Sequence, residues 1–398
     1  MIPPAWVPLL VLIFLLGVIL QLPWLVSFAV AVGAVLYLAR RWANHTLDHI
    51  SYQRRWHYRR GFPGEKTDLR IEVRNQKWLP LSWLRTGDAW PNAVAPTDTS
   101  VLAPSHLPDT RQLVNVYHLR WQERISRSFE VVFRQRGIHP LGPVELQSSD
   151  LFGLYTQTGE QSAKELLVVF PEILPLARLS LSAEDPFGDR RAQRRLFEDP
   201  NQTIGVRPYH PEDGFRRIHW PATTRTGSLQ TRIYQPVSAR TLMLCLNVAT
   251  MNHIWEGTRP ALLEHLVKVC ATLAYHGSQD GYAVGLISNG CLAHADQPFR
   301  INPGRSPDQL ALLLQALAGV TAYTSAPFEA YLLRSLTSMP LGATLVIITA
   351  ILSPTLPETL LRLRRYRAHT TLLSLAREVP PNLPDVRVVH LPFEQEAA

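Results

Sequence analysis

The sequence has few cysteines, and their arrangement argues against two kinds of site. Only three occur in 398 residues, Cys245, Cys270 and Cys291, and each stands inside an apolar run. An odd number without CxxC spacing or a neighbouring histidine at ligand distance argues against a disulfide framework and a zinc site. We therefore expect three buried free thiols in a reducing compartment.

The motifs of nucleotide and hydrolase chemistry are also missing. The chain contains no GxGxxG and no GxxxxGK[ST], so nothing in it supports binding of a nucleotide phosphate. It has no GxSxG turn to present a nucleophilic serine. We therefore expect a protein without catalysis and without a cofactor.

Apolar residues are concentrated at the start of the chain. Two runs, Pro4–Leu20 and Trp24–Ala39, are separated by a short break that contains a proline. Each approaches the ~20 residues that a helix needs to cross a bilayer. No basic region precedes the first run and no small-x-small site precedes the second, which argues against a cleaved signal peptide. We predict two transmembrane helices in residues 1–40, with residues 4–39 in contact with the lipid bilayer.

The charge balance is basic, with 40 Lys and Arg against 32 Asp and Glu and a formal net charge of +8. A basic chain can meet anionic lipid, nucleic acid or an acidic partner. Six arginines follow the second apolar run: Arg40, Arg41, Arg54, Arg55, Arg59 and Arg60. Positive residues that flank a transmembrane end stay in the cytoplasm. We therefore expect a basic juxtamembrane segment at 41–55, a location in the inner or plasma membrane, and the bulk of the chain in the cytoplasm.

Residues 56–170 contain short stretches in which apolar and polar residues alternate. Leu69–Asn75 and Leu113–Trp121 are examples, and Gly, Pro and Asn separate such stretches. This period of two is typical of strands that bury one face. We predict a β-sandwich of immunoglobulin-like size.

Residues 171–239 have the composition of a connector. Four arginines, Arg190, Arg191, Arg194 and Arg195, stand among acidic residues, which is typical of a solvated arm, with a nucleic-acid contact as the alternative. The chain has no recognisable reading helix or stacking platform. We therefore expect no nucleic-acid partner.

Residues 240–394 alternate compact apolar runs with helical patterns. The runs are Thr241–Val248, Tyr282–Ser288, Ala343–Thr349 and Thr370–Leu375. The first predicted helix is capped by Thr258 and ended by Gly277, and further helices are predicted from Pro307 to Gly319, over Pro327–Ser338 and over Pro357–Arg367. This order predicts an α/β domain with a parallel, doubly wound sheet.

Ligands of such sheets bind beyond the carboxyl ends of the strands. The first predicted strand ends at Asn247, Ala249 and Thr250, where a divalent cation would require an Asp and hydroxyl residues. We therefore predict no metal.

The segment Thr203–Tyr234 is densest in arginine and aromatic residues. Because buried charge must be paired, so many guanidinium groups indicate a structural junction or a binding surface. The candidate residues are Arg207, Tyr209, Asp213, Arg216, Ile218, Trp220, Arg225, Gly227 and Arg232. An alternative is an enzyme that uses His219 and Asp213 as an acid/base pair, which requires a pocket around both side chains.

The same segment resembles the signature of the DUF58 family of bacterial and archaeal membrane-associated proteins. The matching positions are Arg207, Tyr209, Pro211, Asp213, Arg216, Ile218, Trp220, Thr223, Arg225, Gly227, Leu229 and Arg232, whereas Glu212 stands where the family usually has Gly. Residues Arg134–Tyr155 resemble an upstream element of the family, with Leu151 where Pro is usual.

The resemblance implies a β-sandwich followed by a von Willebrand factor A-like domain. It also implies a membrane-anchored partner of a MoxR-type AAA+ ATPase in envelope or complex maturation. Many von Willebrand A domains bind a metal through Asp-x-Ser-x-Ser, from which Asn247, Ala249 and Thr250 depart. A metal-dependent adhesion or chaperone-like module is therefore the alternative rather than the expected function.

Overall fold

The computed structural model describes residues 6–106, 108–179, 181, 187, 197–211, 213–237, 240–293, 295, 297–335, 339, 342–365, 369–384 and 386–393. The chain divides into two compact units, residues 1–170 and 171–398. The four arginines of the predicted connector arm, Arg190, Arg191, Arg194 and Arg195, and the unusual Glu212 lie outside the described residues.

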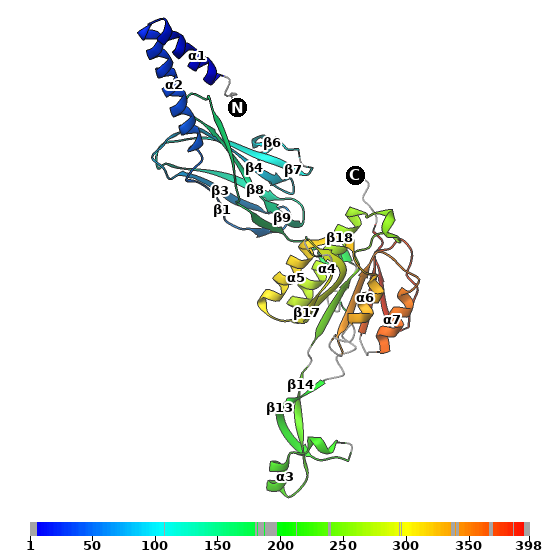
Figure 1. Cartoon of the computed structure of the whole chain (residues 1–398). Helices are drawn as coiled ribbons and strands as arrows, with labels where there is room; N and C mark the ends of the chain where they lie inside the picture. Colours follow the sequence, from blue (N-terminus) through cyan, green and yellow to red (C-terminus); the bar gives the residue numbers. More distant parts are fainter. Residues whose placement is uncertain are drawn as a thin grey trace. The chain divides into compact units, whose positions relative to one another are not determined.

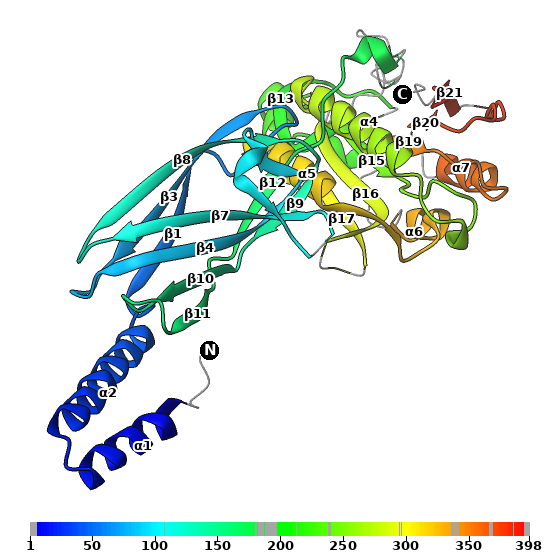
Figure 2. The ribbon, with the colours of Figure 1, turned by 90° about the horizontal axis from the view of Figure 1, so that it is seen from above.

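The first unit begins with a pair of helices, α1 (Trp6–Ile19) and α2 (Pro23–Asn44), joined by a tight turn (Figures 1 and 2). In the turn, Gln21 has a φ of 50° and the Leu22 N–H donates to the Gly17 carbonyl at 2.9 Å. The 22 residues of α2 are long and apolar enough to span a membrane. The 14 residues of α1 give only about 21 Å of helix, less than the ~30 Å of a hydrocarbon core. Among the described residues, α2 has the length of a span, and the second predicted transmembrane helix stays a prediction.

The predicted juxtamembrane segment 41–55 is largely regular structure. Helix α2 continues to Asn44, and strand β1 already begins at Ile50. The ammonium group of Lys77 donates to the carbonyl oxygens of His45, at 2.7 Å, and of Thr46. A lysine at this place satisfies carbonyl groups at the helix end that have no partner inside the helix. The end of α2 is thus fastened to the sheets.

The first unit contains three sheets, mostly of antiparallel strands (Figure 1). Their orders are β1-β3-β8-β5, β11-β10-β4-β7-β6 and β2-β12-β9. The strands are β1 (Ile50–Trp56), β2 (Arg60–Gly61), β3 (Lys66–Asn75), β4 (Leu81–Pro91), β5 (Val94–Pro96), β6 (Leu102–Pro104), β7 (Thr110–Leu119), β8 (Arg124–Phe133), β9 (Gly137–Leu141), β10 (Val144–Ser149), β11 (Thr156–Gln161) and β12 (Glu165–Val169). A short 3-10 helix spans Thr99–Val101.

These sheets share one hydrophobic core. Leu69 and Ile71 from β3, Trp90 from β4 and Leu113 from β7 belong to a single buried cluster. Along much of β3, buried and exposed residues alternate, because successive side chains of a strand point to opposite faces. The predicted stretch Leu69–Asn75 lies within β3, and Leu113–Trp121 overlaps most of β7.

Arg54 differs from the rest of the predicted basic cluster. Its side chain is fully buried and pairs with Asp88 on β4. Arg54 therefore cannot bind lipid headgroups, whereas Arg40 and Arg41 on α2 are exposed.

The second unit contains a mainly parallel sheet of order β17-β16-β15-β19-β20-β21, with β18 paired to β16. The strands are β15 (Thr241–Leu246), β16 (Ala283–Leu292), β17 (Pro298–Gly304), β18 (Val320–Thr324), β19 (Thr344–Thr349), β20 (His369–Ser374) and β21 (Val386–His390). Strands β16, β15, β19, β20 and β21 pair in parallel, and β17 and β18 run antiparallel to β16. The predicted parallel sheet is confirmed by these pairings.

Helices cover both faces of this sheet. They are α4 (Pro260–Gln279), α5 (Pro307–Gly319), α6 (Phe328–Ser335) and α7 (Leu356–Arg365), with 3-10 turns at Leu176–Leu179 and Ile254–Glu256. Helix α4 packs on Leu242, whereas α6 and α7 share a core cluster with Met243. Leu242 and Met243 are neighbours in one strand and so point to opposite faces.

Helix α4 begins one residue later than predicted. Arg259 instead of Thr258 is its N-cap residue, and the helix starts at Pro260, because proline is favoured in the first turn. It also continues to Gln279, two residues past its predicted end at Gly277. Gly277 is buried, and a Cβ at that position would lie 2.6 Å from Cδ2 of Leu242. This glycine allows close packing of α4 on β15.

Candidate functional site

The segment Thr203–Tyr234, here called the signature segment, forms most of a two-stranded ribbon and the chain between its strands (Figure 1). Strand β13 (Phe197–Pro208) pairs antiparallel with β14 (Gln230–Val237). Between them lie a 3-10 turn, Phe215–Arg217, and helix α3 (Trp220–Thr226).

Asp213 organises the first half of this connection. One carboxylate oxygen accepts from Nη2 of Arg207 at 2.6 Å, and the other accepts from the His210 N–H at 3.0 Å and the Thr231 hydroxyl at 3.4 Å. The hydrogen bond from the His210 backbone, followed by that from the Arg207 guanidinium, holds the pKa of Asp213 below its ordinary value of 3.8. The predicted residues Arg207 and Asp213 therefore fix the shape of the turn.

Helix α3 is capped at both ends by residues of the signature segment. Nδ1 of His219 accepts from the Ala222 N–H at 3.0 Å, as an N-cap side chain does. Gly227 ends the helix with a φ of 67°, a left-handed conformation that glycine adopts at little cost, and its N–H donates to the Thr223 carbonyl. The Thr223 hydroxyl accepts in turn from the Gln230 N–H at 3.1 Å, which connects α3 to β14.

Ile218, Tyr209 and Arg232 lie nearer the interior of the segment. Ile218 is buried and forms a bridge with Thr231. The Tyr209 ring stacks on Phe215, with 5.9 Å between ring centres. Arg232 is half-buried, and its Nε has no hydrogen-bond partner among the described residues.

Most side chains of the 3-10 turn and α3 face solvent. Phe215 and Trp220 are 76% and 62% exposed, and Arg216 and Arg225 are also exposed. Within the part of the chain that the structure describes, neither arginine has a hydrogen bond or an ion pair from its guanidinium group. We call Phe215, Arg216, Trp220 and Arg225 the tip surface. It combines apolar rings with unpaired positive charge.

The structure gives His219 and Asp213 separate partners. His219 caps α3, while Asp213 binds Arg207, His210 and Thr231. Among the described residues, no hydrogen bond joins the two side chains.

The strand end at Asn247, Ala249 and Thr250 is an amide and hydroxyl network. Asn247 donates to the Thr349 hydroxyl at 3.1 Å and accepts from the Ala249 N–H and the Asn289 side chain. The Thr250 hydroxyl accepts from the Arg259 N–H at 2.9 Å. Among the described residues, no group of three or more His, Cys, Asp and Glu side chains could hold a metal ion.

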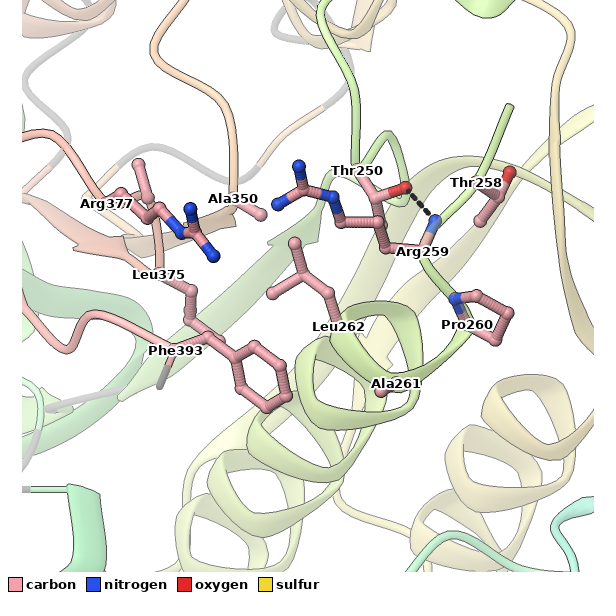
Figure 3. Close-up of a pocket in the computed structure, with 11 residues that line it drawn as sticks. Thr250, Thr258, Arg259, Pro260, Ala261, Leu262, Ala350, Leu375, Arg377 and Phe393 are labelled. Carbon is pink, nitrogen blue, oxygen red and sulfur yellow. Dashed lines mark hydrogen bonds between the residues drawn. The ribbon is translucent and has the colours of Figure 1, made fainter. Parts of the chain in front are cut away.

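A cavity of about 300 Å³ lies beside this network, beyond the carboxyl ends of β15, β19 and β20 (Figure 3). Thr250, Ala350 and Leu375 line it where the three strands end. Arg259 precedes α4 and Arg377 follows β20, and both also line the cavity.

Three residues of these surfaces were not identified from the sequence. Phe215 stands within the signature segment but outside the resemblance motif, and its exposure is set by the 3-10 turn. Arg259 and Arg377 each follow a predicted strand at a short distance, and the rule that ligands bind at strand ends could have drawn attention to them.

The prediction that the three cysteines are buried free thiols is confirmed. Cys245, Cys270 and Cys291 are all buried free thiols. Burial raises the pKa of Cys245 to about 12 and also raises that of Cys270. A raised pKa makes Cys245 and Cys270 poor nucleophiles in the folded protein.

The protein is a multidomain chain of helices and sheets. It has an apolar helix long enough to span a membrane, a unit of sheets, and a signature segment that leads into a parallel α/β sheet. Residues 205–396 match the family described as "Protein of unknown function DUF58", which supports the resemblance in the sequence over that range. An uncharacterised protein, YeaD of Bacillus subtilis (strain 168), is 20% identical over 228 residues, 57% of this chain and 52% of that protein. The chain thus matches about half the length of this relative.

Solved structures show only slight likeness. A beta-glucosidase from Listeria innocua in complex with gluconolactone has a TM-score of 0.17 and 12% identity, over 28% of this chain and 15% of that one. CaCohA2 from Clostridium acetobutylicum has a TM-score of 0.18 and 10% identity, over 30% of this chain and 90% of that one. Scores this low carry no argument about fold or function.

Proposed function

We propose that this chain is a membrane-anchored, cytoplasmic-facing interaction protein whose signature segment docks an acidic protein partner, without catalysis. The tip surface carries this proposal. Aromatic residues and arginine are enriched among the residues that dominate binding energy at protein interfaces. The hydrogen bonds of Asp213, His219 and Gly227 hold the backbone under these side chains, so little ordering cost remains for binding.

The proposal also assigns a domain type to each part of the fold. The helix pair is a transmembrane hairpin, the sheets of the first unit are an immunoglobulin-like sandwich, and the parallel sheet is a von Willebrand factor A-like domain. Exposed Arg40 and Arg41 at the end of α2 support a cytoplasmic location of both units, because positive flanks stay inside.

The partner that the family resemblance implies is a MoxR-type AAA+ ATPase, in envelope or complex maturation. On this proposal an acidic patch of the ATPase faces Arg216 and Arg225, and Phe215 and Trp220 enter apolar pockets between the acidic groups. Opposite charge would give speed and specificity of association, and the two rings would supply most of the affinity.

A photo-crosslinking amino acid at position 215, in the full chain in its native membrane, tests this function. The matched position is Trp255, which is 81% exposed in the same unit but outside the signature segment. We expect an adduct with an AAA+ ATPase from position 215 and none from 255. In the same background, Arg216→Gln with Arg225→Gln should reduce the adduct several-fold, and Arg362→Gln should leave it unchanged.

The proposal fails if both positions give the same adduct, or if removal of the two tip charges has no effect. Orientation is measured separately by Tyr58→Cys, an exposed position of the first unit. A membrane-impermeant maleimide should label this cysteine only after the cells are opened.

A further inference from the structure

The cavity at the strand ends differs from the tip surface in its chemistry. It lies at the edge of a parallel sheet where ligands of α/β proteins bind. Its volume of about 300 Å³ is at the lower end of the range for pockets that hold small organic molecules. No acidic side chain is among its lining residues in the described chain.

Two arginines from distant parts of the sequence meet at this cavity. The guanidinium groups of Arg259 and Arg377 point toward one another across it (Figure 3). Neither guanidinium has a hydrogen bond or ion pair within the described ranges, and the Arg259 side chain does not cap α4. Two like charges that face one another are unfavourable, and an anion between them would remove this repulsion. The guanidinium fork matches the oxygen atoms of carboxylate and phosphate groups.

The rest of the lining is largely apolar. Leu262, Leu375 and Phe393 form the wall below the two guanidinium groups in Figure 3. We propose that this cavity binds a small organic anion, with its carboxylate or phosphate group between Arg259 and Arg377 and its apolar body on Leu262, Leu375 and Phe393. The site would therefore bind an anion at the strand ends. Asn247, Ala249 and Thr250 at the same edge supply no carboxylate that could bind a metal ion.

Calorimetry with the full chain in lipid nanodiscs tests this site, with empty nanodiscs as the blank. The probes are benzoate, phenyl phosphate and the neutral benzamide. We expect saturable binding of at least one anionic probe and none of benzamide. Because a hydrogen bond to a charged group contributes ~1.5–3 kcal/mol, Arg259→Gln and Arg377→Gln should each weaken binding roughly ten-fold or more.

The matched control is Arg362→Gln, which removes an exposed arginine of α7 that pairs with Glu358. It should leave the affinity unchanged. The tighter of the two anionic probes identifies which acid group the site prefers. Absence of binding by both, or equal binding by the wild type and both cavity variants, overturns the proposal.

A second, independent observation concerns the turn formed by residues 150–155, here called the Asp150 turn. The buried Asp150 carboxylate accepts from the Phe152 N–H at 2.9 Å and the Tyr155 N–H at 2.6 Å. Gly153 has a φ of 71° and donates its N–H to the Asp150 carbonyl. This rigid turn holds Leu151 and Phe152 outward, at 55% and 66% exposure.

These two apolar side chains lie beside the end of the membrane helix. With Leu38, Ala39 and Trp42 of α2 they line a cavity of about 200 Å³. Leu38 is also exposed. The exposed Arg40 and Arg41 lie at nearly the same height along α2, where we expect the lipid headgroups to begin. The apolar surface of α2 therefore continues onto the Asp150 turn.

We infer that Leu151 and Phe152 contact the acyl chains of the bilayer that α2 enters. This inference rests on the proposed membrane anchoring. It makes the Asp150 turn a second membrane contact, which would fix the rotation of the first unit about α2.

Nitroxide labels on single added cysteines of the full chain in nanodiscs test the contact, since the native thiols are buried. Phe152→Cys should be more accessible to oxygen than to a water-soluble nickel chelate, and Tyr58→Cys should show the reverse. Phe28→Cys on α2 reports the anchor itself. Lipid exposure at 28 with water exposure at 152 overturns the inference alone, whereas water exposure at both overturns the anchoring as well.

Discussion

Arg54 and Asp88 form a buried ion pair that connects two sheets of the first unit. Nη2 of Arg54 lies 2.5 Å from Oδ1 of Asp88, and both side chains are 0% exposed. Arg54 is on β1, in the four-stranded sheet, and Asp88 is on β4, in the five-stranded sheet. The Tyr52 hydroxyl and the Ala163 carbonyl complete the network. Burial raises the pKa of Asp88, and the hydrogen bonds from Arg54 oppose that change.

Replacing one partner of this pair should destabilise the first unit strongly. Arg54→Met leaves a buried carboxylate without its cation, for which we expect a loss of about 3–5 kcal/mol in the free energy of unfolding. Arg54→Met combined with Asp88→Leu should recover most of the loss, because no charge stays buried alone. Chemical denaturation of the full chain in nanodiscs measures both. Arg55→Met, at a largely exposed neighbour, is the control and should cost at most ~1 kcal/mol.

The signature segment should lose its order in acid because of Asp213. Its folded-state pKa lies below the ordinary 3.8, so the stabilisation is fully present above that pH and is lost as pH falls through the lower folded value. Protection factors of the amide hydrogens in β13 and β14, corrected for the intrinsic exchange rate at each pH, should therefore fall below about pH 4. Asp213→Asn should already show low protection factors at neutral pH, and they should change little with acid. Acid sensitivity equal to that of the wild type in this variant would assign the transition to other carboxyl groups.

Lys77 should titrate far below an ordinary lysine. Burial lowers its pKa from 10.5 to about 8, and the charge of Asp48 acts in the opposite direction. Since the folded state releases this proton first, stability should rise as pH increases from about 8 to 10.5. Lysine labelled at the ε-carbon reports the titration by NMR, and Lys77→Met identifies the resonance. Asp48→Asn should lower the measured pKa further, and a value near 10.5 in the wild type would contradict the burial.

Gly277→Ala should destabilise the second unit by steric conflict. The added methyl group would lie 2.6 Å from Cδ2 of Leu242, and overpacking of this kind costs about 1–3 kcal/mol. The combination with Leu242→Ala should be less harmful than the sum of the two single changes, because the conflict disappears. Gln279→Ala at the exposed end of the same helix is the control. Thermal unfolding compares these four variants with the wild type.

Much of this fold could be predicted because its main elements follow simple periodicities. The apolar runs of β15, β16, β19 and β20 are buried on both faces and therefore stand out in the sequence. Strand β17 contains two prolines and partly exposed residues, and its place beside β16 depends on tertiary pairing. The ion pair of Arg54 could not be predicted for the same reason. A run of basic residues has the same sequence pattern whether its side chains face lipid or a buried acid such as Asp88.

Of the two candidate sites, the signature segment could be predicted from the sequence and the cavity could not. The signature identified Arg207, Asp213 and Gly227, whose partners lie within the same short segment. The cavity was not found because Arg259 and Arg377 meet only after the sheet brings two strand ends together. A sequence motif can identify residues that contact one another within one segment. A site formed by distant segments can be predicted only when the order of the strands in the sheet is known.

The junction between α2 and β1 has a mechanical consequence. Only five residues, 45–49, separate the helix from the strand, and Lys77 ties the helix end to the sheets. A long flexible linker would let the first unit swivel freely above the bilayer. On the proposed membrane anchoring, the short junction and the Lys77 hydrogen bonds would couple α2 to the sheets, so that a tilt of α2 in the bilayer would turn the attached sheets with it.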